Sequence, residues 1–400
     1  MKKVFTLLAL ALTIGFSAKA QESFKDRLQV GGFIQTDFEW LQYEEKSNTG
    51  SNQFYDPKKD NADNDYFIRY GLRRGGIRLA YNQGIVQGIF ELDLNDGGID
   101  PKAAIINIKP AEWIEINAGL QTIWFGEETS YPTPKQEMLE HCEMLRNIFF
   151  LDRDLGVKIS LIAPQKSVFN GLRLDFGVVS GNSINKTPDG KVNFVGHLKY
   201  KTNIRNVYAS IGTSLYYGKV NNASVSYISF DDNELDITFA KENTKNKRLY
   251  YGIDAQVKFP TIIGNTEIKT EWVYGIQPSM ENSFRSPFNN EYNENTPFNI
   301  ERKFFGGYVY WFQNIKQTPF RLLFKYTLFN PNTTADKEYY LSSTDVTFHT
   351  FGLGCQWNIT KGLNLTALFN INKNEKVEHI PAYSYDRKDN HFTMRLQYEF

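Results

Sequence analysis

Apolar and polar side chains alternate along many short segments of this chain, and the last ten residues show the pattern most plainly. Phe392, Met394, Leu396, Tyr398 and Phe400 fall on one face of an extended segment, and polar residues fall on the other. Alternation with a period of two is the pattern of a β-strand that has one apolar and one polar face. The segment therefore predicts a β-strand that ends with an aromatic residue.

The same pattern predicts sixteen strands. After residue 20 there is no apolar stretch near 18 residues long, so a helical membrane protein is excluded. The predicted strands are residues 28–40, 67–81, 85–94, 103–109, 113–125, 156–163, 171–179, 192–200, 206–217, 248–258, 265–277, 303–314, 320–329, 345–358, 363–371 and 391–400.

The connections between these strands also alternate, in length. Those after even-numbered strands are mostly short, whereas those after odd-numbered strands are mostly long, as at residues 41–66, 126–155, 218–247 and 330–344. The connections of a soluble β-sandwich are not expected to alternate between long and short. A transmembrane β-barrel, in contrast, has long outer loops and short inner turns. We therefore expect one all-β domain, a transmembrane antiparallel β-barrel of about sixteen strands. The strand that ends at Phe400 would close it against the first strand.

The N-terminus predicts export. Lys2 and Lys3 precede an apolar run of roughly a dozen residues, which is too short to span a bilayer, and small residues follow. We expect a secretory signal peptide at residues 1–20 and a barrel domain at residues 21–400. Export and a barrel together predict a location in the outer membrane, with the lipids of that membrane around the wall.

Composition agrees with a barrel and disfavours a nucleic-acid partner. Aromatic residues form 15% of the chain, which suits the aromatic girdles of a barrel, and the mean hydropathy of −0.45 suits strands with one wet face. The predicted signal peptide contains three lysines and no acid, so 42 basic and 45 acidic residues remain. Binding to a phosphate backbone needs a basic excess instead. Cys142 and Cys355 are expected to be separate thiols.

Four arginines of the second predicted strand cannot all face the lumen in a regular strand. If the apolar residues before Gly75 face the lipid, Arg69 and Arg73 must face the lumen. If the apolar residues after Gly75 face the lipid, Arg74 and Arg78 must face the lumen. Both registers must hold, because an arginine in lipid costs roughly 2–4 kcal/mol at mid-depth. We predict a β-bulge near the glycine pair, which inserts the one residue that this change of register requires.

Residues 126–155 contain the most convincing helix pattern of the mature chain. Thr133 and Gln136 have capping-box spacing, and a stripe of apolar residues recurs at helical spacing at Met138, Cys142 and Leu145. A helix with one apolar stripe needs a wall to lie on. We therefore expect this third outer loop to fold into the lumen and narrow it, rather than to cap the outside of the barrel.

Inward arginines opposite an acidic loop would place a transverse field across a constriction, which is a general means of sorting charged solutes. The residues predicted to line this constriction are Arg74, Arg78, Arg146, Arg153, Glu137 and Glu140. Alternatively, Arg74 and Arg78 are wall residues that pair with acidic side chains of adjacent strands, at Asp37, Glu39, Glu91 or Asp93.

The remaining motifs are weak. The acidic segment Asp60–Asp65 lacks the glycine and the terminal Glu of an EF-hand, so we interpret it as a solvated loop. We find no zinc spacing, no phosphate-cradling glycine motif and no recognisable catalytic Ser, His and Asp spacing. The chain is therefore predicted to need no cofactor or metal and not to be an enzyme.

Several segments resemble the phosphate-selective porin O and P family of outer-membrane channels. The resemblance lies at Val30–Asp37, Arg69–Arg78, Phe90–Asp93, Ala118–Gln121 and Asp152–Val157. It implies a sixteen-stranded trimeric channel with an inward third loop and, for some members, a ladder of Arg and Lys that selects phosphate. At the position of a Glu-Arg pair in the family, this chain has Glu127 and Glu128.

Three functional hypotheses follow. The first is a porin, a passive diffusion channel for small hydrophilic solutes, with anions such as phosphate among them. The second is a non-conducting barrel whose outer loops bind or scaffold a surface partner. The third, an outer-membrane enzyme, has the least support from the residues.

Overall fold

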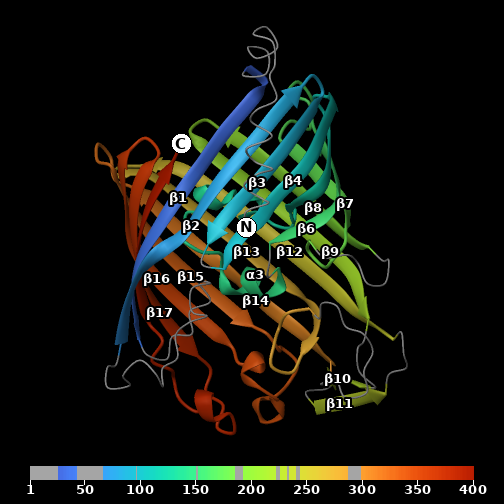
Figure 1. Ribbon diagram of the computed structural model, residues 1–400. Helices are drawn as coiled ribbons and strands as arrows, with labels where there is room; N and C mark the ends of the chain where they lie inside the picture. Colours follow the sequence, from blue (N-terminus) through green and yellow to red (C-terminus); the bar gives the residue numbers. More distant parts are fainter. Residues whose placement is uncertain are drawn as a thin grey trace, which may run out of the picture.

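A computed structural model of the chain shows a β-barrel closed by its first and last strands (Figure 1). The structure describes residues 26–42, 66–95, 97–149, 152–184, 192–221, 226–231, 234–239, 244–286 and 299–400. The predicted signal peptide and the segment Asp60–Asp65 lie outside the described residues. Within those ranges, no helix is long and apolar enough to cross a membrane.

Sixteen of the eighteen strands in the described residues form the barrel wall. Strand β9 pairs directly with β12, so the hairpin of β10 and β11 lies outside the wall. The strands are β1 (Leu28–Gln42), β2 (Tyr66–Gln83), β3 (Val86–Asn95), β4 (Gly98–Ala111), β5 (Ile114–Thr122), β6 (Arg153–Ile162), β7 (Leu172–Val179), β8 (Asn193–Ile204), β9 (Val207–Asn221), β10 (Ser226–Asp231), β11 (Glu234–Phe239), β12 (Lys245–Thr261), β13 (Gly264–Met280), β14 (Asn299–Asn314), β15 (Phe320–Asn330), β16 (Phe348–Thr360), β17 (Leu363–Asn374) and β18 (His391–Glu399).

All sixteen predicted strands are present, with ends that differ by a few residues. Strand β4 begins at Gly98, earlier than predicted, so the connection after the third strand is short rather than long. The short helices are η2 (Glu128–Ser130), η3 (Thr133–Lys135), α3 (Glu143–Ile148), η4 (Lys337–Tyr339), η5 (Ser343–Asp345) and η6 (Pro381–Tyr383).

The first and last strands close the barrel as predicted. They pair antiparallel from Phe33 opposite Glu399 to Leu41 opposite His391. Gly32 and Phe400 exchange both of their backbone hydrogen bonds, each at 3.0 Å. The sheet therefore has no open edge in the wall at this seam.

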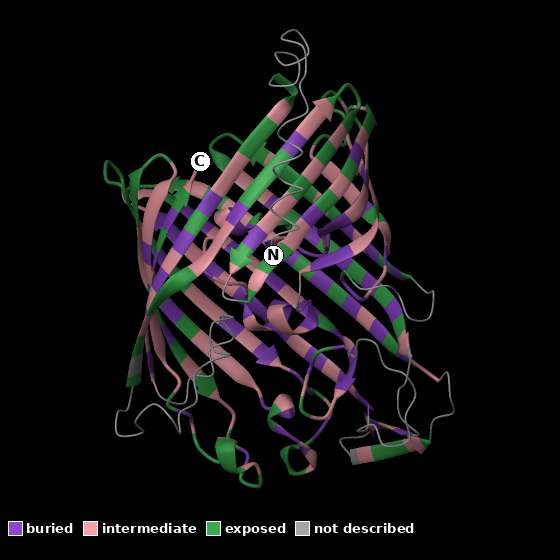
Figure 2. Cartoon of the chain, in the orientation of Figure 1, coloured by how far each residue is buried: buried purple, intermediate pink, exposed green. Residues whose placement is uncertain are grey.

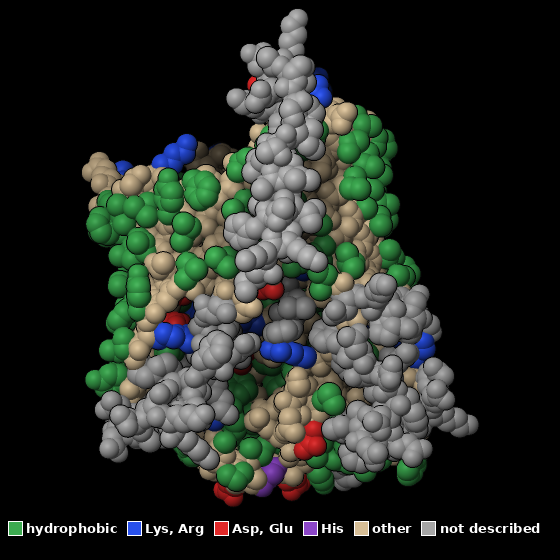
Figure 3. All heavy atoms as spheres, in the orientation of Figure 1, with side chains coloured by type: hydrophobic (Ala, Val, Ile, Leu, Met, Phe, Trp, Pro, Cys, Tyr) green, Lys and Arg blue, Asp and Glu red, His purple; other side chains and the backbone are tan. Residues whose placement is uncertain are grey.

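The two faces of the wall differ in chemistry. Gln35, Asp37 and Glu39 of β1 are buried on the lumen side, whereas Val30 and Ile34 are exposed on the outside. Figure 2 shows the same alternation of buried and exposed residues along many strands, and Figure 3 shows hydrophobic side chains gathered on both flanks of the barrel. An apolar outer face around a polar interior is the arrangement of a barrel in lipid.

The bulge predicted in β2 is present. Gln35 pairs with Arg74, but the next residue, Thr36, pairs with Leu72, so Arg73 is the inserted residue. The insertion lies two positions before Gly75 instead of at the glycine pair. Because of it, the neighbouring residues Arg73 and Arg74 both reach into the lumen, which a regular strand cannot achieve.

The connections after β15 and β17 pack against one another at the end of the barrel opposite the short turns. An apolar cluster joins β10, β14 and the connections after β15 and β17, through Ile228, Ile300, Tyr340, Val346 and Val377. Beside it, Arg302 of β14 and Asp345 of η5 form a fully buried ion pair at 2.8 Å. These described connections therefore form packed structure over β14.

Candidate functional site

The connection between β5 and β6 lies inside the barrel, and we call residues 123–149 the inner loop. Figure 1 shows α3 within the ring of strands. Side chains of the inner loop form hydrogen bonds or ion pairs with strands on several sides of the wall, at Lys199, Lys269, Arg321 and Arg395. The inner loop therefore divides the lumen, in agreement with the sequence-based expectation.

The continuous helix predicted from Thr133 onward is wrong. Residues Thr133–Lys135 form only a turn of η3, which has no side-chain cap, and α3 starts later, at Glu143. Between them the chain turns at Leu139, where φ is 46°, and the Glu140 amide donates to the Met138 carbonyl.

The reason for the broken helix lies in the partners of Glu137 and Glu140. A helix would place residues three apart on one face, whereas here Glu137 binds β13 and β15 and Glu140 binds β2 and β18. The apolar stripe of Met138, Cys142 and Leu145 is nevertheless fully buried against the wall.

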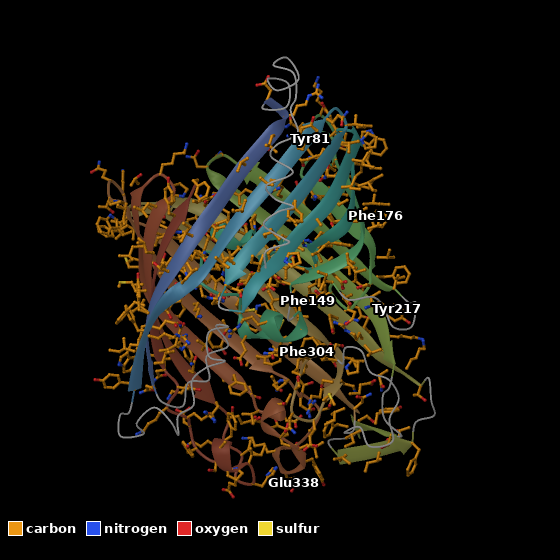
Figure 4. All side chains as sticks on the ribbon, viewed as in Figure 1. Tyr81, Phe149, Phe176, Tyr217, Phe304 and Glu338 are labelled. Carbon is orange, nitrogen blue, oxygen red and sulfur yellow. The ribbon has the colours of Figure 1, made fainter. Side chains whose placement is uncertain are left out.

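One side of the lumen is filled by an aromatic core. Phe125 and Phe149 of the inner loop lie 5.3 Å apart, centroid to centroid, and Phe149 lies 5.8 Å from Tyr250 of β12. Tyr250 in turn lies 5.4 Å from Phe304 of β14. Figure 4 shows Phe149 and Phe304 close to α3 inside the barrel, whereas Phe176 points outward from the wall. This packing leaves the opposite side, along β15 to β18, for a solute.

Glu140 holds the inner loop to the first and last strands. Its carboxylate accepts hydrogen bonds from Arg73 at 2.9 Å, Arg74 at 3.1 Å and Arg395 at 2.7 Å. Arg395 also donates two hydrogen bonds to Asp37, each at 2.8 Å. Arginines of β2 and β18 therefore contact the acidic inner loop directly, so these buried guanidinium groups have an anionic partner.

Glu137 holds the opposite side of the inner loop. Its carboxylate accepts hydrogen bonds from Arg321 of β15, at 2.6 Å, and from Lys269 of β13. Arg321 and Lys269 also form ion pairs with Glu267 of β13. Both ends of the turn around residue 139 are thus fixed to rigid strands.

His141 is a buried group between two carboxylates. Its ring nitrogens lie 3.8 Å from Glu128 and 3.8 Å from Asp152. Burial alone would lower the pKa of His141, but the attraction of the Asp152 and Glu128 carboxylates outweighs it and raises the pKa to about 9. A pKa in this range favours the protonated imidazole at neutral pH, and the attraction to Asp152 links the inner loop to the residue before β6. The Nε2 atom of His141 also lies 2.7 Å from the Gln136 side-chain amide.

Cavities of the described structure lie along β15 to β18, and two of them matter for a solute path. The outer vestibule, of about 470 Å³, lies on the side of the long connections, and Arg146 and Lys325 are among the residues that line it. The inner vestibule, of about 310 Å³, lies on the side of the short turns, next to η3. Leu139 and Arg395 line both cavities. The two vestibules therefore lie on either side of the place where the turn of the inner loop approaches β18, and we call this place the aperture.

The predicted constriction residues occupy different places. Arg74, Glu137 and Glu140 hold the inner loop, as described above, and Arg146 of α3 faces the outer vestibule. Arg153 is buried at the start of β6, where it donates to the Thr122 hydroxyl and lies 3.5 Å from Asp152. Arg78 is exposed on β2 and pairs in register with Gly31 and Glu91, away from the inner loop.

Sequence reasoning missed Arg395, Leu139 and Lys325. The alternation of the last strand places Arg395 on the polar face, so its inward direction could have been noted from the sequence. Its contact with Glu140 spans 255 positions of the chain, and no local pattern indicates it. The turn at Leu139 leaves no mark in the hydrophobic pattern either. Cys142 and Cys355 are both free thiols, as predicted.

No protein-family model and no curated protein matches the sequence. Solved structures do match in fold. OprB of Pseudomonas putida is 8% identical, with 96% of each chain covered and a TM-score of 0.60. The outer membrane channel DcaP of Acinetobacter baumannii is 12% identical, with 93% of this chain and 97% of that chain covered and a TM-score of 0.58. OmpT of Vibrio cholerae, an outer membrane protein in its trimer form, is 12% identical, with 93% and 99% covered and a TM-score of 0.51. The chain therefore has the closed-barrel fold of these outer-membrane proteins.

Proposed function

We propose that the protein is a porin, a passive diffusion channel in the outer membrane for small hydrophilic solutes. The observation that supports this function is the pair of vestibules that open toward opposite ends of the barrel and share Leu139 and Arg395. A solute would enter past the long connections, pass the aperture, and leave past the short turns. The aromatic core fills the other side of the lumen in the described part of the chain, which favours a path along β15 to β18.

The charges along this path favour anions. Arg146 and Lys325 line the outer vestibule, and Arg395 lines both vestibules. Glu140, Glu143 and Asp389 also line the outer vestibule, but three arginines already share the Glu140 carboxylate. Rings of basic side chains are the means by which pores prefer anions. Phosphate is one such anion, in line with the resemblance to the phosphate-selective porin O and P family.

The same proposal extends to location and assembly. The apolar outer face of the wall and the predicted signal peptide support insertion into the outer membrane. A homotrimer is the state that the family resemblance implies, and the matched OmpT structure is described as a trimer form. We therefore propose three parallel barrels, each with its own path.

Single-channel recording in a planar bilayer tests the path directly. The test protein carries Leu139→Cys together with Cys142→Ala and Cys355→Ala, so that the aperture has one reactive thiol. A small anionic thiol reagent should reduce the conductance, because the added group fills the aperture. The matched control places the cysteine at Glu338, which is exposed on η4 at the long-connection end (Figure 4). There, the reagent should leave the conductance unchanged.

The outcomes separate the hypotheses. Reversal potentials in a KCl gradient should show chloride to be favoured over potassium. A purified, folded protein without ohmic steps would refute the channel and favour the surface-binding barrel. Ohmic steps that the reagent does not alter at position 139 would instead place the path elsewhere in the lumen.

A further inference from the structure

Lys325 and Arg146 face the outer vestibule, and among the described residues neither is in direct contact with a carboxylate. Lys325 lies on the lumen side of β15, where a Cβ atom at Gly352 would come within 2.6 Å of its Cγ atom. Arg146 lies in the last turn of α3, which packs against β15, and the two cations repel each other. Among the described residues, neither side chain forms a hydrogen bond or an ion pair, and the Arg146 Nε atom is buried without a partner.

This situation differs from that of the other basic side chains that touch the inner loop. Arg73, Arg74, Arg395, Arg321 and Lys269 each bind a carboxylate directly. Glu128 and Glu140 attract Lys325 without contacting it directly. Two adjacent cations that are largely removed from water and have no directly bonded counter-charge are unfavourable, and an anion between them removes both the repulsion and the missing hydrogen bonds. The pair is therefore suited to bind an anionic group from the cavity.

The rest of the cavity is suited to an organic molecule. Its volume of about 470 Å³ is far larger than one bare oxyanion and lies in the range of sites for small organic ligands. Phe329 and Phe348 supply apolar surface, and Thr350 and Asn370 supply polar groups. The Asn370 Oδ1 atom is buried without a hydrogen-bond partner, so it is available as an acceptor.

We propose that Arg146 and Lys325 form a binding site for a small organic anion, whose carboxylate or phosphate group lies between them and whose body lies against Phe329 and Phe348. The proposal rests on the proposed channel function, for which this site would collect solutes at the outer side of the aperture. It adds a specific binding site along the path and a preference for organic anions over inorganic ions.

Isothermal titration calorimetry on the purified full-length protein in detergent tests the site. The probes are benzoate, phenyl phosphate, acetate, inorganic phosphate and the uncharged benzyl alcohol. Benzoate or phenyl phosphate should bind about tenfold more tightly than acetate or inorganic phosphate, because the ring gains apolar contacts. Whichever of the two binds more tightly identifies the preferred anionic group. Benzyl alcohol should show no binding.

The variants are Arg146→Gln, Lys325→Gln and the double substitution. Each single variant should weaken benzoate binding, and the double variant should weaken it by about tenfold or more. The matched control is Lys373→Gln, which also removes one positive charge from the outer end of the barrel but from an exposed pair with Asp386. It should leave the affinity unchanged. Lys325→Gln removes no hydrogen bond, so it remains informative should Arg146→Gln fold poorly.

Three results would overturn the site: no binding of either aromatic anion, equal binding by the double variant, or equal binding of benzoate and acetate. The channel proposal is judged separately by conductance. Benzoate binding that depends on Lys325 in a protein without ohmic steps would refute the channel and leave the site standing. Ohmic steps in a protein that does not bind benzoate would support the channel and refute the site.

Discussion

At the scale of single residues, His141 is a buried cation that depends on two carboxylates. Glu128 belongs to the same inner loop, whereas Asp152 directly precedes β6. The pKa of His141 is about 9 in the folded protein, above the ordinary value of about 6.5. Because the folded state binds this proton more tightly than the unfolded chain does, protonation of His141 stabilises the position of the inner loop.

The sign of the pH dependence follows. The stabilisation is complete below about pH 6.5 and is lost as the pH rises through about 9, with a total of about 3 kcal/mol. We expect the free energy of unfolding in detergent to fall over this window in the wild type and to change less in His141→Gln. Denaturant unfolding at a series of pH values measures it, and parallel curves for the two proteins would contradict the assignment.

Leu139 carries the strongest prediction about the size of the aperture. Its φ of 46° is a conformation that glycine adopts readily, so Leu139→Gly should keep the turn while it removes the side chain that lines both vestibules. The single-channel conductance should rise. Leu353→Ala, a truncation on the exposed outer face of β16, is the control and should leave the conductance as it is. A lower conductance in Leu139→Gly would mean that the loop collapses into the path.

Residues also show which contacts a sequence can reveal. The cost of arginine in lipid was sufficient to predict the bulge in β2, because the conflict between the two registers is local to that strand. The position of the inserted residue, Arg73, depends on its bidentate contact with Glu140, which lies 67 positions away in the chain. Local patterns thus indicate that a side chain faces inward but not which partner it meets.

At the scale of elements, the inner loop is held to the wall by carboxylates instead of by one helical face. Glu140 alone joins it to β2 and β18 through three arginines. The helical pattern in the sequence was real, since its apolar stripe is buried. It did not produce a helix because ion pairs to opposite sides of the lumen outweigh the small propensity differences of a short segment.

Replacing Glu140 should therefore affect both the loop and the selectivity. Glu140→Gln leaves Arg73, Arg74 and Arg395 without their shared partner, and the loss of a largely buried ion pair destabilises the loop by roughly 3 kcal/mol. The ratio of chloride to potassium permeability should rise, and the open-channel current should become noisier.

The control for this change is Lys373→Gln. It removes an ion pair with Asp386 that is largely exposed and lies outside both vestibules, so its effect on stability should be below about 1 kcal/mol. Reversal potentials and current noise of the two variants in the same KCl gradient give the comparison. If Glu140→Gln has the selectivity and noise of Lys373→Gln, the arginine cluster does not act on the permeating ions.

At the scale of the whole molecule, the barrel was predictable because its pattern repeats. Each of the sixteen wall strands has an apolar outer face, and the long and short connections alternate for most of the circuit. An error in the predicted end of one strand does not change the predicted number of strands. The hairpin of β10 and β11 was missed because it lies in a long connection whose strands have no lipid-facing side. The division of the lumen was not predictable in detail, since it depends on contacts between distant strands.

Closure is the property that belongs to the molecule as a whole, and Gly32 is the residue to test it. A Cβ atom there would lie 2.6 Å from the Gly76 carbonyl oxygen and 2.7 Å from the Phe400 ring. Because Gly32 and Phe400 form the backbone pair at the seam, Gly32→Ala should push the first and last strands apart. Overpacking of this kind costs about 1–3 kcal/mol.

The matched control is Gly71→Ala in β2, where a Cβ atom meets nothing within 4 Å. The temperature at which the folded band is lost on a heat-modifiable gel should be lower for Gly32→Ala and unchanged for Gly71→Ala. Equal temperatures would show that the seam yields without cost, and that closure depends on the strand pairing of β1 and β18 alone.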